Sequence, residues 1–359
     1  MKAAVCREFG KPLVIEEVNL AKPQASELRI KILATAICHS DISYADGAWG
    51  GTLPAVYGHE CAGVVETVGS GVTTVKVGDH VVVTLIRSCG HCHGCSMGNP
   101  VTCSTQFPLD AASPIKDKDG KSVVQSMRTG GFAEKVLVHE SQCVTVPKNI
   151  KMASASLLAC GVITGFGAVT NTAKVPAGSH VVVIGTGGVG LNSIQGARVV
   201  GANPIIAIDT SDAALEMAVK LGATHTINPK KVDVEKEVFK IVPHGVDHAI
   251  GAVGSVPAFL NGMNILGPGG TLIILGAPGN GDKMTIDPIF HVLRGERGMR
   301  GSKYGSANPA TEFPMLIELY MAGKLDLDSL LTASYSLDEA TKAFEVLAKG
   351  GAGRGLIKF

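Results

Sequence analysis

The chain has 359 residues, a length that suits two domains better than one hydrophobic core. Its net charge is +1 and 18% of its residues are charged, which argues against a nucleic-acid-binding or membrane-surface protein. No uninterrupted apolar run reaches the length of a membrane span, and Arg7 and Glu8 interrupt the N-terminus before the core of a signal peptide could form. Nine cysteines, in a chain too large to need disulfides, favour metal ligands or buried thiols. We therefore expect a soluble, cytoplasmic protein.

The N-terminal part of the chain contains short β-type runs. Residues 13–18, 28–33, 64–68 and 81–86 are rich in apolar and β-branched side chains, with proline- and glycine-containing turns among them. This pattern predicts antiparallel strands rather than alternating strands and helices.

Three possible zinc ligands, Cys38, His59 and Glu60, lie among these predicted strands. Zinc accepts sulfur, nitrogen and oxygen donors together, so the three side chains could share one ion. A buried thiol and a core histidine would explain the same residues, and from spacing alone that alternative is the stronger one.

The sharpest metal signal is a loop with the pattern Cys-x2-Cys-x2-Cys-x7-Cys, formed by Cys89, Cys92, Cys95 and Cys103. Four thiolates in one loop match the closed tetrahedral shell of a structural zinc site. His91 and His93 lie between the cysteines, but four sulfurs already complete the shell. We expect both histidines to be ordinary loop side chains.

The composition and the predicted secondary structure change twice in the middle of the chain. Residues 108–131 are polar and turn-rich and predict a surface insertion, whereas residues 132–146 return to strand-like alternation. Residues 151–172 predict a helix that carries Cys160. By itself Cys160 would be an ordinary buried thiol.

Residues 181–209 carry a dinucleotide-binding pattern. A short apolar strand leads into Gly-x-Gly-x-x-Gly, then a helical segment, then a second apolar run that ends in Asp209. One glycine permits the tight turn, one lets the backbone approach a pyrophosphate, and one allows close helix packing. The acid lies at about the 20-residue spacing at which a carboxylate binds ribose hydroxyls. The predicted cofactor-binding residues are Gly185, Gly187, Gly188, Val189, Gly190 and Asp209.

The segments after this motif continue in a βαβ rhythm. A helix is expected at 213–221, and short strands at 224–227, 246–250 and 271–275 alternate with helical segments. Such alternation predicts an α/β fold with a parallel sheet. The tail from Thr311 contains two amphipathic helices.

In this order the motifs resemble the zinc-dependent medium-chain alcohol dehydrogenase family over essentially the full chain. The resemblance rests on CHSD at 38–41, GHE at 58–60, the four-cysteine loop, the Cys160 helix and the GTGGVG fingerprint. It implies a doubly wound parallel Rossmann sheet and an antiparallel, partly barrel-like (GroES-like) catalytic domain. The implied catalytic zinc-binding domain comprises 1–155 and 306–359 and the NAD-binding domain 156–305, with the active site in the cleft between them.

The resemblance also assigns the metal ligands. Cys38, His59 and Cys160 become ligands of a catalytic zinc, with Glu60 as a transient alternative ligand and Asp41 as the carboxylate that orients the ligand histidine. The four-cysteine loop becomes the structural site, so two zinc ions are expected per chain.

Further positions concern the proton path, the coenzyme and the pocket. By this resemblance Ser40 corresponds to the hydroxyl that accepts the alcohol proton. His39 and Arg354 correspond to groups that contact the coenzyme pyrophosphate. Trp49 and Leu85 correspond to residues that line the substrate pocket. A structural hydroxyl at Ser40, surface cations at His39 and Arg354, and core packing of Trp49 are the open alternatives.

Two positions depart from the family pattern. Many relatives have a histidine three residues beyond the relay hydroxyl, where this chain has Ser43, so the end of the proton path is open. Arg87 precedes the cysteine loop and could bind an acidic group on a substrate, or it could be a surface arginine.

The expected coenzyme is NAD rather than NADP. Asp209 is followed by Thr210 and Ser211, and no arginine follows within several residues to accept a 2′-phosphate, which the carboxylate would repel. A homo-oligomer, dimer or tetramer, is expected from the resemblance only.

The implied activity is reversible hydride transfer between a primary or secondary alcohol and NAD⁺, with zinc as Lewis acid. One alternative is a thiol-adduct (S-hydroxymethyl) formaldehyde dehydrogenase, which shares these motifs. A zinc-ribbon nucleic-acid-binding protein is disfavoured by the balanced charge. A non-catalytic zinc- and nucleotide-binding protein is disfavoured by the complete ligand trio and relay hydroxyl.

Overall fold

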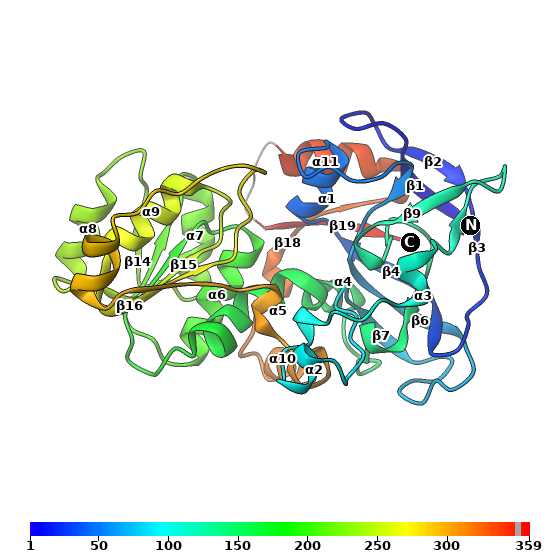
Figure 1. Cartoon of the computed structure of the whole chain (residues 1–359), viewed down its shortest axis with the longest axis horizontal. Helices are drawn as coiled ribbons and strands as arrows, with labels where there is room; N and C mark the ends of the chain where they lie inside the picture. Colours follow the sequence, from blue (N-terminus) through cyan, green and yellow to red (C-terminus); the bar gives the residue numbers. More distant parts are fainter. Residues whose placement is uncertain (349–352) are drawn as a thin grey trace. The chain divides into compact units, whose positions relative to one another are not determined.

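The computed structural model describes residues 1–348 and 353–359 (Figure 1). They form two compact units: one runs from Met1 to Cys160 and includes the C-terminal part of the chain from Asn308, and the other spans Gly161–Ala307. The predicted α/β class is confirmed, because the first unit is built on mainly antiparallel sheets and the second on a parallel sheet.

The first unit contains a curled sheet with the strand order β11 (Cys143–Thr145), β7 (His80–Val83), β6 (Glu60–Val68), β4 (Glu27–Ala36), β19 (Arg354–Lys358) and β18 (Leu331–Tyr335). Strand β10 (Lys135–His139) also belongs to this sheet and pairs with β4. All of its pairings are antiparallel except β18 with β19. Leu28, Ile30 and Ile32 alternate along β4 and are fully buried, because alternate side chains of a strand point to one face.

A second sheet of the same unit has the order β2 (Val14–Glu17), β1 (Lys2–Cys6), β5 (Ala55–Val56), β9 (Ser122–Gln125), β8 (Ile115–Lys116) and β3 (Asn19–Leu20). Strands β8 and β9 lie inside residues 108–131, and Ile115 and Val123 belong to the hydrophobic core. The prediction that this segment is a surface insertion is therefore wrong. Its few apolar residues stand at positions where strand pairing turns them inward.

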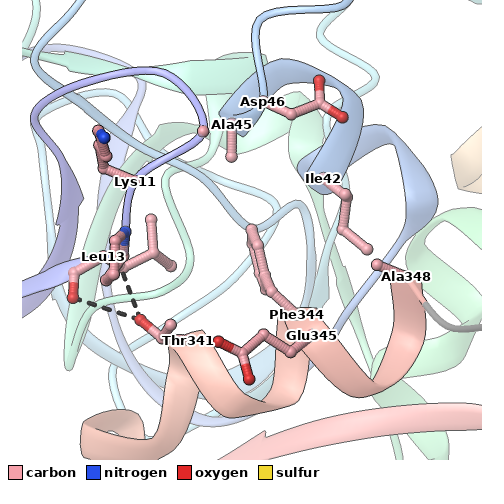
Figure 2. A pocket seen from close by; sticks show the side chains of 11 residues that line it. Lys11, Leu13, Ile42, Ala45, Asp46, Thr341, Phe344, Glu345 and Ala348 are labelled. Atoms are coloured by element: carbon pink, nitrogen blue, oxygen red, sulfur yellow. Dashed lines mark hydrogen bonds between the residues drawn. The ribbon is translucent and has the colours of Figure 1, made fainter.

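The helices of the first unit are α1 (His39–Ala45), α2 (His93–Ser96), α3 (Pro108–Ala111), α4 (Met152–Leu157), α10 (Pro309–Met321) and α11 (Ala340–Ala348). Figure 2 shows how α1 packs near α11: Ile42 and Ala45 face the ring of Phe344 across a hollow of about 210 Å³. The Thr341 hydroxyl links α11 to Leu13 by two hydrogen bonds, drawn as dashed lines in Figure 2. Helix α11 therefore contacts α1 directly and the Leu13 segment through Thr341.

The second unit contains a six-stranded parallel sheet with the order β14 (His225–Ile227), β13 (Ile205–Ile208), β12 (Val181–Ile184), β15 (Val246–Gly251), β16 (Leu266–Ile274) and β17 (Gly298–Gly301). Its α-helices are α5 (Ile163–Gly167), α6 (Gly188–Val199), α7 (Asp212–Leu221), α8 (Val234–Ile241) and α9 (Val256–Asn264). The chain order reverses between β12 and β15, which is the switch point at which doubly wound folds bind nucleotides. The predicted Rossmann sheet is confirmed.

The helix predicted at 151–172 is present as Met152–Ala173, with π-helical turns at Leu158–Val162 and Ala168–Ala173. It is long and apolar enough to cross a membrane, but 89% of its most apolar window is buried within the protein. Burial to this extent is typical of a helix in the core of a protein.

Candidate active site

Four buried side chains of the first unit converge on one point. The ligand atoms of Cys38, His59, Glu60 and Cys160 all lie within 4.8 Å of one another. The pairing of β4 with β6 sets Ala36 opposite Glu60, which brings the segment after one strand to the start of the other. Cys160 comes from the π-helical turn, a helix irregularity that is frequent at functional sites.

Asp41 fixes the orientation of His59. Its carboxylate is fully buried and accepts hydrogen bonds from the backbone N–H groups of Cys38 and Gly58, both at 2.9 Å. Nδ1 of His59 lies 3.1 Å from Oδ1 of the same carboxylate. Because Nδ1–H donates to Asp41, Nε2 is the nitrogen left to bind a metal.

The pKa values of the two cluster thiols shift in opposite directions. A hydrogen bond from Cys160 lowers the pKa of Cys38 well below its ordinary value, and the same pairing raises the pKa of Cys160. Thiolates are the metal-binding form of cysteine, and a lowered pKa favours that form at Cys38.

Glu60 has one paired and one unpaired oxygen. Oε1 forms an ion pair with Arg354, which extends from β19, whereas buried Oε2 has no hydrogen-bond partner among the described residues. Burial raises the pKa of Glu60, and the positive charge of Arg354 opposes the rise. An unsatisfied buried carboxylate oxygen beside two sulfurs and an imidazole suits a divalent cation, so the residues present fit zinc.

The other predicted residues of this region are placed as follows. Ser40 Oγ lies 3.7 Å from Cys38 Sγ, and His39, at the start of α1, is exposed. Leu85 is buried. The Trp49 ring is half-buried and packs edge-on against Tyr44, with 5.3 Å between the ring centroids.

The cysteine-rich loop forms a second cluster: the sulfurs of Cys89, Cys92, Cys95 and Cys103 lie within 4.8 Å of one another. Backbone N–H groups hydrogen-bond to Cys92 and lower its thiol pKa. Neither loop histidine joins the cluster, and Nδ1 of His91 contacts the carbonyl of Cys89 at 2.9 Å. The donor set fits a structural zinc.

Arg87 is neither a surface residue nor open to a substrate, so both interpretations from the sequence are wrong. Its side chain is buried, with Nε donating to Gln142 Oε1 at 2.8 Å and Nη1 to Asp110 Oδ1 at 3.0 Å. Nη2 donates to the carbonyl of Arg128 at 3.2 Å, and the guanidinium lies 5.6 Å from the Phe107 ring centroid. No local sequence pattern reveals these partners, because they come from distant segments.

The glycine motif of the second unit joins β12 to α6. Gly185 has φ +89°, which favours glycine, and a Cβ on Gly190 would lie 1.8 Å from the Gly185 carbonyl oxygen. The helix begins at Gly188, so the N–H groups of its first turn are available to a phosphate.

Asp209 follows β13 beside this turn. Its Oδ2 accepts hydrogen bonds from the N–H and hydroxyl of Thr186, and its Oδ1 from the N–H of Ser211. A cavity of about 320 Å³ includes Gly185 and Asp209 in its wall, and no lysine or arginine of the described ranges, 1–348 and 353–359, lines it. The cavity suits an adenosine without a 2′-phosphate.

Comparison with known proteins matches both units. The family model "Alcohol dehydrogenase GroES-like domain" matches residues 24–148, and "Zinc-binding dehydrogenase" matches residues 188–322. Alcohol dehydrogenase 1 of Pisum sativum is 36% identical over 99% of this chain and 96% of its own length. Alcohol dehydrogenase class-P of Arabidopsis thaliana is 34% identical over 99% of this chain and 96% of its own length.

Solved structures show the same likeness. Benzyl alcohol dehydrogenase of Acinetobacter calcoaceticus is 34% identical, with a TM-score of 0.92 over 100% of this chain and 99% of its own. A putative zinc-binding dehydrogenase of Sinorhizobium meliloti, bound to NADP, is 27% identical with a TM-score of 0.84, and the match covers 100% of this chain and 99% of that one. The chain belongs to the zinc-dependent medium-chain alcohol dehydrogenase family. The predicted oxidoreductase class, zinc and a nicotinamide cofactor are confirmed at this level.

Proposed function

We propose that the cluster of Cys38, His59 and Cys160 is the catalytic zinc site of an alcohol dehydrogenase that converts a primary or secondary alcohol and NAD⁺ reversibly into aldehyde or ketone and NADH. The main support for this proposal is the buried set of donor atoms, in which Asp41 orients the imidazole of His59. Bound zinc supplies Lewis acidity to the alcohol oxygen, and NAD⁺ supplies the hydride acceptor.

The chain's own residues then have separate tasks. Asp41 holds His59 in the tautomer that presents Nε2. Arg354 holds one oxygen of Glu60, which leaves the other as an alternate ligand. The Ser40 hydroxyl, beside Cys38, receives the alcohol proton. Burial of the cluster limits its contact with solvent.

Coenzyme recognition is assigned to the second unit, with the pyrophosphate at the start of α6 and the ribose hydroxyls at Asp209. The proposed residues are Gly185, Gly187, Gly188, Val189, Gly190 and Asp209, with His39 and Arg354 completing the pyrophosphate contacts. The cation-free wall around Asp209 supports NAD over NADP. Residues 1–155 and 306–359 would be the catalytic domain and 156–305 the NAD-binding domain.

A homo-oligomer is proposed from the edge of the parallel sheet. Among the described strands β17 pairs only with β16, and Ile289, Phe290, Leu293 and Met299 near it are exposed apolar side chains. An unpaired edge beside apolar surface suits a second copy of the chain. We also propose that the protein is located in the cytoplasm.

The test is NADH formation across primary, secondary, aromatic and allylic alcohols, with NAD⁺ and NADP⁺, using protein loaded with two zinc ions per chain. Cys160→Ala should lose one zinc and all turnover yet bind NADH normally, whereas Cys143→Ala, which alters a buried thiol outside both clusters, should keep both zinc ions. Unchanged turnover in Cys160→Ala would reject the assignment. Turnover restricted to formaldehyde with glutathione would favour the thiol-adduct alternative.

A further inference from the structure

The backbone carbonyl of Ala159, the residue before Cys160, accepts a hydrogen bond from outside its own helix. The donor is the hydroxyl of Thr84, whose Oγ1 lies 2.7 Å from the carbonyl oxygen. Thr84 follows directly after β7, and both Thr84 and Ala159 are buried. The end of β7 and the turn that carries a proposed zinc ligand are therefore joined by a hydrogen bond inside the protein.

The single proton of the Thr84 hydroxyl is committed to this bond. A hydroxyl donates one hydrogen bond and can also accept, and here Oγ1 lies 3.4 Å from the backbone nitrogen of Ile86, whose N–H donates to it. Ala159 lies in the π-helical turn Leu158–Val162. Turns of this kind are rare in proteins, which indicates that contacts around them must stabilise them. A bond to the carbonyl of Ala159 is such a contact, one residue from the sulfur-bearing position.

The side chain of Gln142 holds Thr84 from the other side. Its Nε2 donates to the carbonyls of Thr84 at 2.8 Å and of Arg128 at 3.0 Å. Its Oε1 accepts from Arg87 Nε at 2.8 Å and from the N–H of His139 at 3.2 Å. The two donors and two lone pairs of the buried amide are thus all used. The N–H of Thr84 in turn donates to the Gln142 carbonyl at 2.9 Å, so both backbone groups of Thr84 bind one residue.

Arg87 anchors this network from the segment that enters the cysteine loop. Its buried guanidinium binds Gln142 through Nε and lies 3.0 Å from Asp110 Oδ1 through Nη1. The next residue, Ser88, donates its N–H to Ser141 Oγ at 3.1 Å. Residues 84–88 are therefore fastened to residues 141–142 at both ends, which gives the Thr84 hydroxyl a fixed position from which to hold the helix.

We propose that Thr84 is a positioning residue of the catalytic zinc site: through the carbonyl of Ala159 it holds the turn that directs the Cys160 sulfur toward Cys38 and His59. Thr84 acts through the backbone and not as a ligand. Outer-shell hydrogen bonds that orient zinc ligands typically change metal affinity by about 10- to 100-fold. The inference rests on the proposed assignment of the cluster as a zinc site.

The experiment measures zinc retained per chain during competition with a chelator, starting from the zinc-loaded full chain. Thr84→Val removes the hydroxyl, and we expect the affinity for one of the two ions to fall about tenfold. Thr84→Ser keeps the hydroxyl and should retain zinc as the unmodified chain does. The matched control is Ser156→Ala, which removes a buried hydroxyl that donates to the carbonyl of Ala153 at 2.7 Å within α4, and it should keep both ions.

Two further measurements separate positioning from a general loss of stability. In a Cys160→Ala background Thr84→Val should cause no additional loss of zinc, because the ligand that it positions is already absent. With Co²⁺ in place of zinc, the visible absorption, which depends on the ligand geometry, should change in Thr84→Val and be restored in Thr84→Ser. Thermal unfolding identifies the folded variants. Thr84→Ala is used where the valine methyl, which must lie against the carbonyl, prevents folding.

Unchanged zinc retention and an unchanged Co²⁺ spectrum in Thr84→Val would overturn the proposal, as would an equal loss of zinc in Ser156→Ala. A loss that persisted in full in the Cys160→Ala background would place the effect at the cysteine loop and would also contradict it. If the unmodified chain bound zinc at the cysteine loop alone, the proposed function itself would have failed.

Discussion

The carboxylate of Asp41 lies 3.1 Å from Nδ1 of His59. It also accepts hydrogen bonds from the backbone N–H groups of Cys38 and Gly58. One buried side chain thus fixes the start of α1, the turn before β6 and the ring of a proposed metal ligand.

Asp41→Asn tests this relationship. The amide keeps the size of the side chain but loses the charge and one acceptor, so we expect zinc affinity at the catalytic cluster to fall about 10- to 100-fold. Competition with a chelator, read out as zinc retained per chain, measures the change. Asp46→Asn, at the exposed end of the same helix, is the control and should retain zinc. Equal zinc retention in both variants would contradict the assigned role of Asp41.

A separate prediction concerns the zinc content and the stability of the cysteine loop. Cys92→Ser should reduce the zinc content from about two ions per chain to about one and lower the unfolding temperature, because metal binding stabilises the folded loop. Elemental analysis and calorimetry measure both. His91→Ala alters the same loop outside the cluster and should keep both ions. Loss of zinc in that control would mean that the fourth ligand was wrongly assigned.

Asp209→Asn should weaken the preference for NAD. Neutralising the carboxylate removes its repulsion of a 2′-phosphate and its bond to the ribose hydroxyls. We expect the ratio of kcat/KM with NAD⁺ to that with NADP⁺ to fall at least about tenfold, or about 1.4 kcal/mol. Asp212→Asn, on the exposed first turn of α7, removes the same charge nearby and serves as control. An unchanged ratio in Asp209→Asn would place coenzyme selection elsewhere.

Phe344→Ala tests the packing behind α1. The ring is buried between α11 and α1 and faces Ile42 (Figure 2). Its loss should lower the free energy of unfolding by about 3 kcal/mol, the low end for phenylalanine truncation because the ring already borders a hollow. Val346→Ala, on the exposed face of the same helix, should cost less than about 1 kcal/mol. Chemical denaturation compares the two variants.

Local motifs were sufficient for much of the fold. The glycine turn and the four-cysteine loop depend on residues close in sequence, so spacing alone predicts them, and the alternation of strands and helices predicts the parallel sheet. The strand expected at 81–86 was placed correctly but ends at Val83. The surface insertion expected at 108–131 was wrong because strand pairing with distant residues buries part of it.

The cluster of Cys38, His59, Glu60 and Cys160, our proposed catalytic site, required tertiary structure. Spacing favoured a buried thiol and a core histidine for Cys38 and His59, and only the pairing of β4 with β6 and the approach of the Cys160 turn bring the donors together. Arg87 is the clearest case. Its partners, Asp110, Arg128 and Gln142, lie 23 to 55 residues away in the chain. The sequence determined which donors and charges this protein carries, but their distances, and therefore their fields and pKa values, were decided only when folding removed them from water and set them side by side.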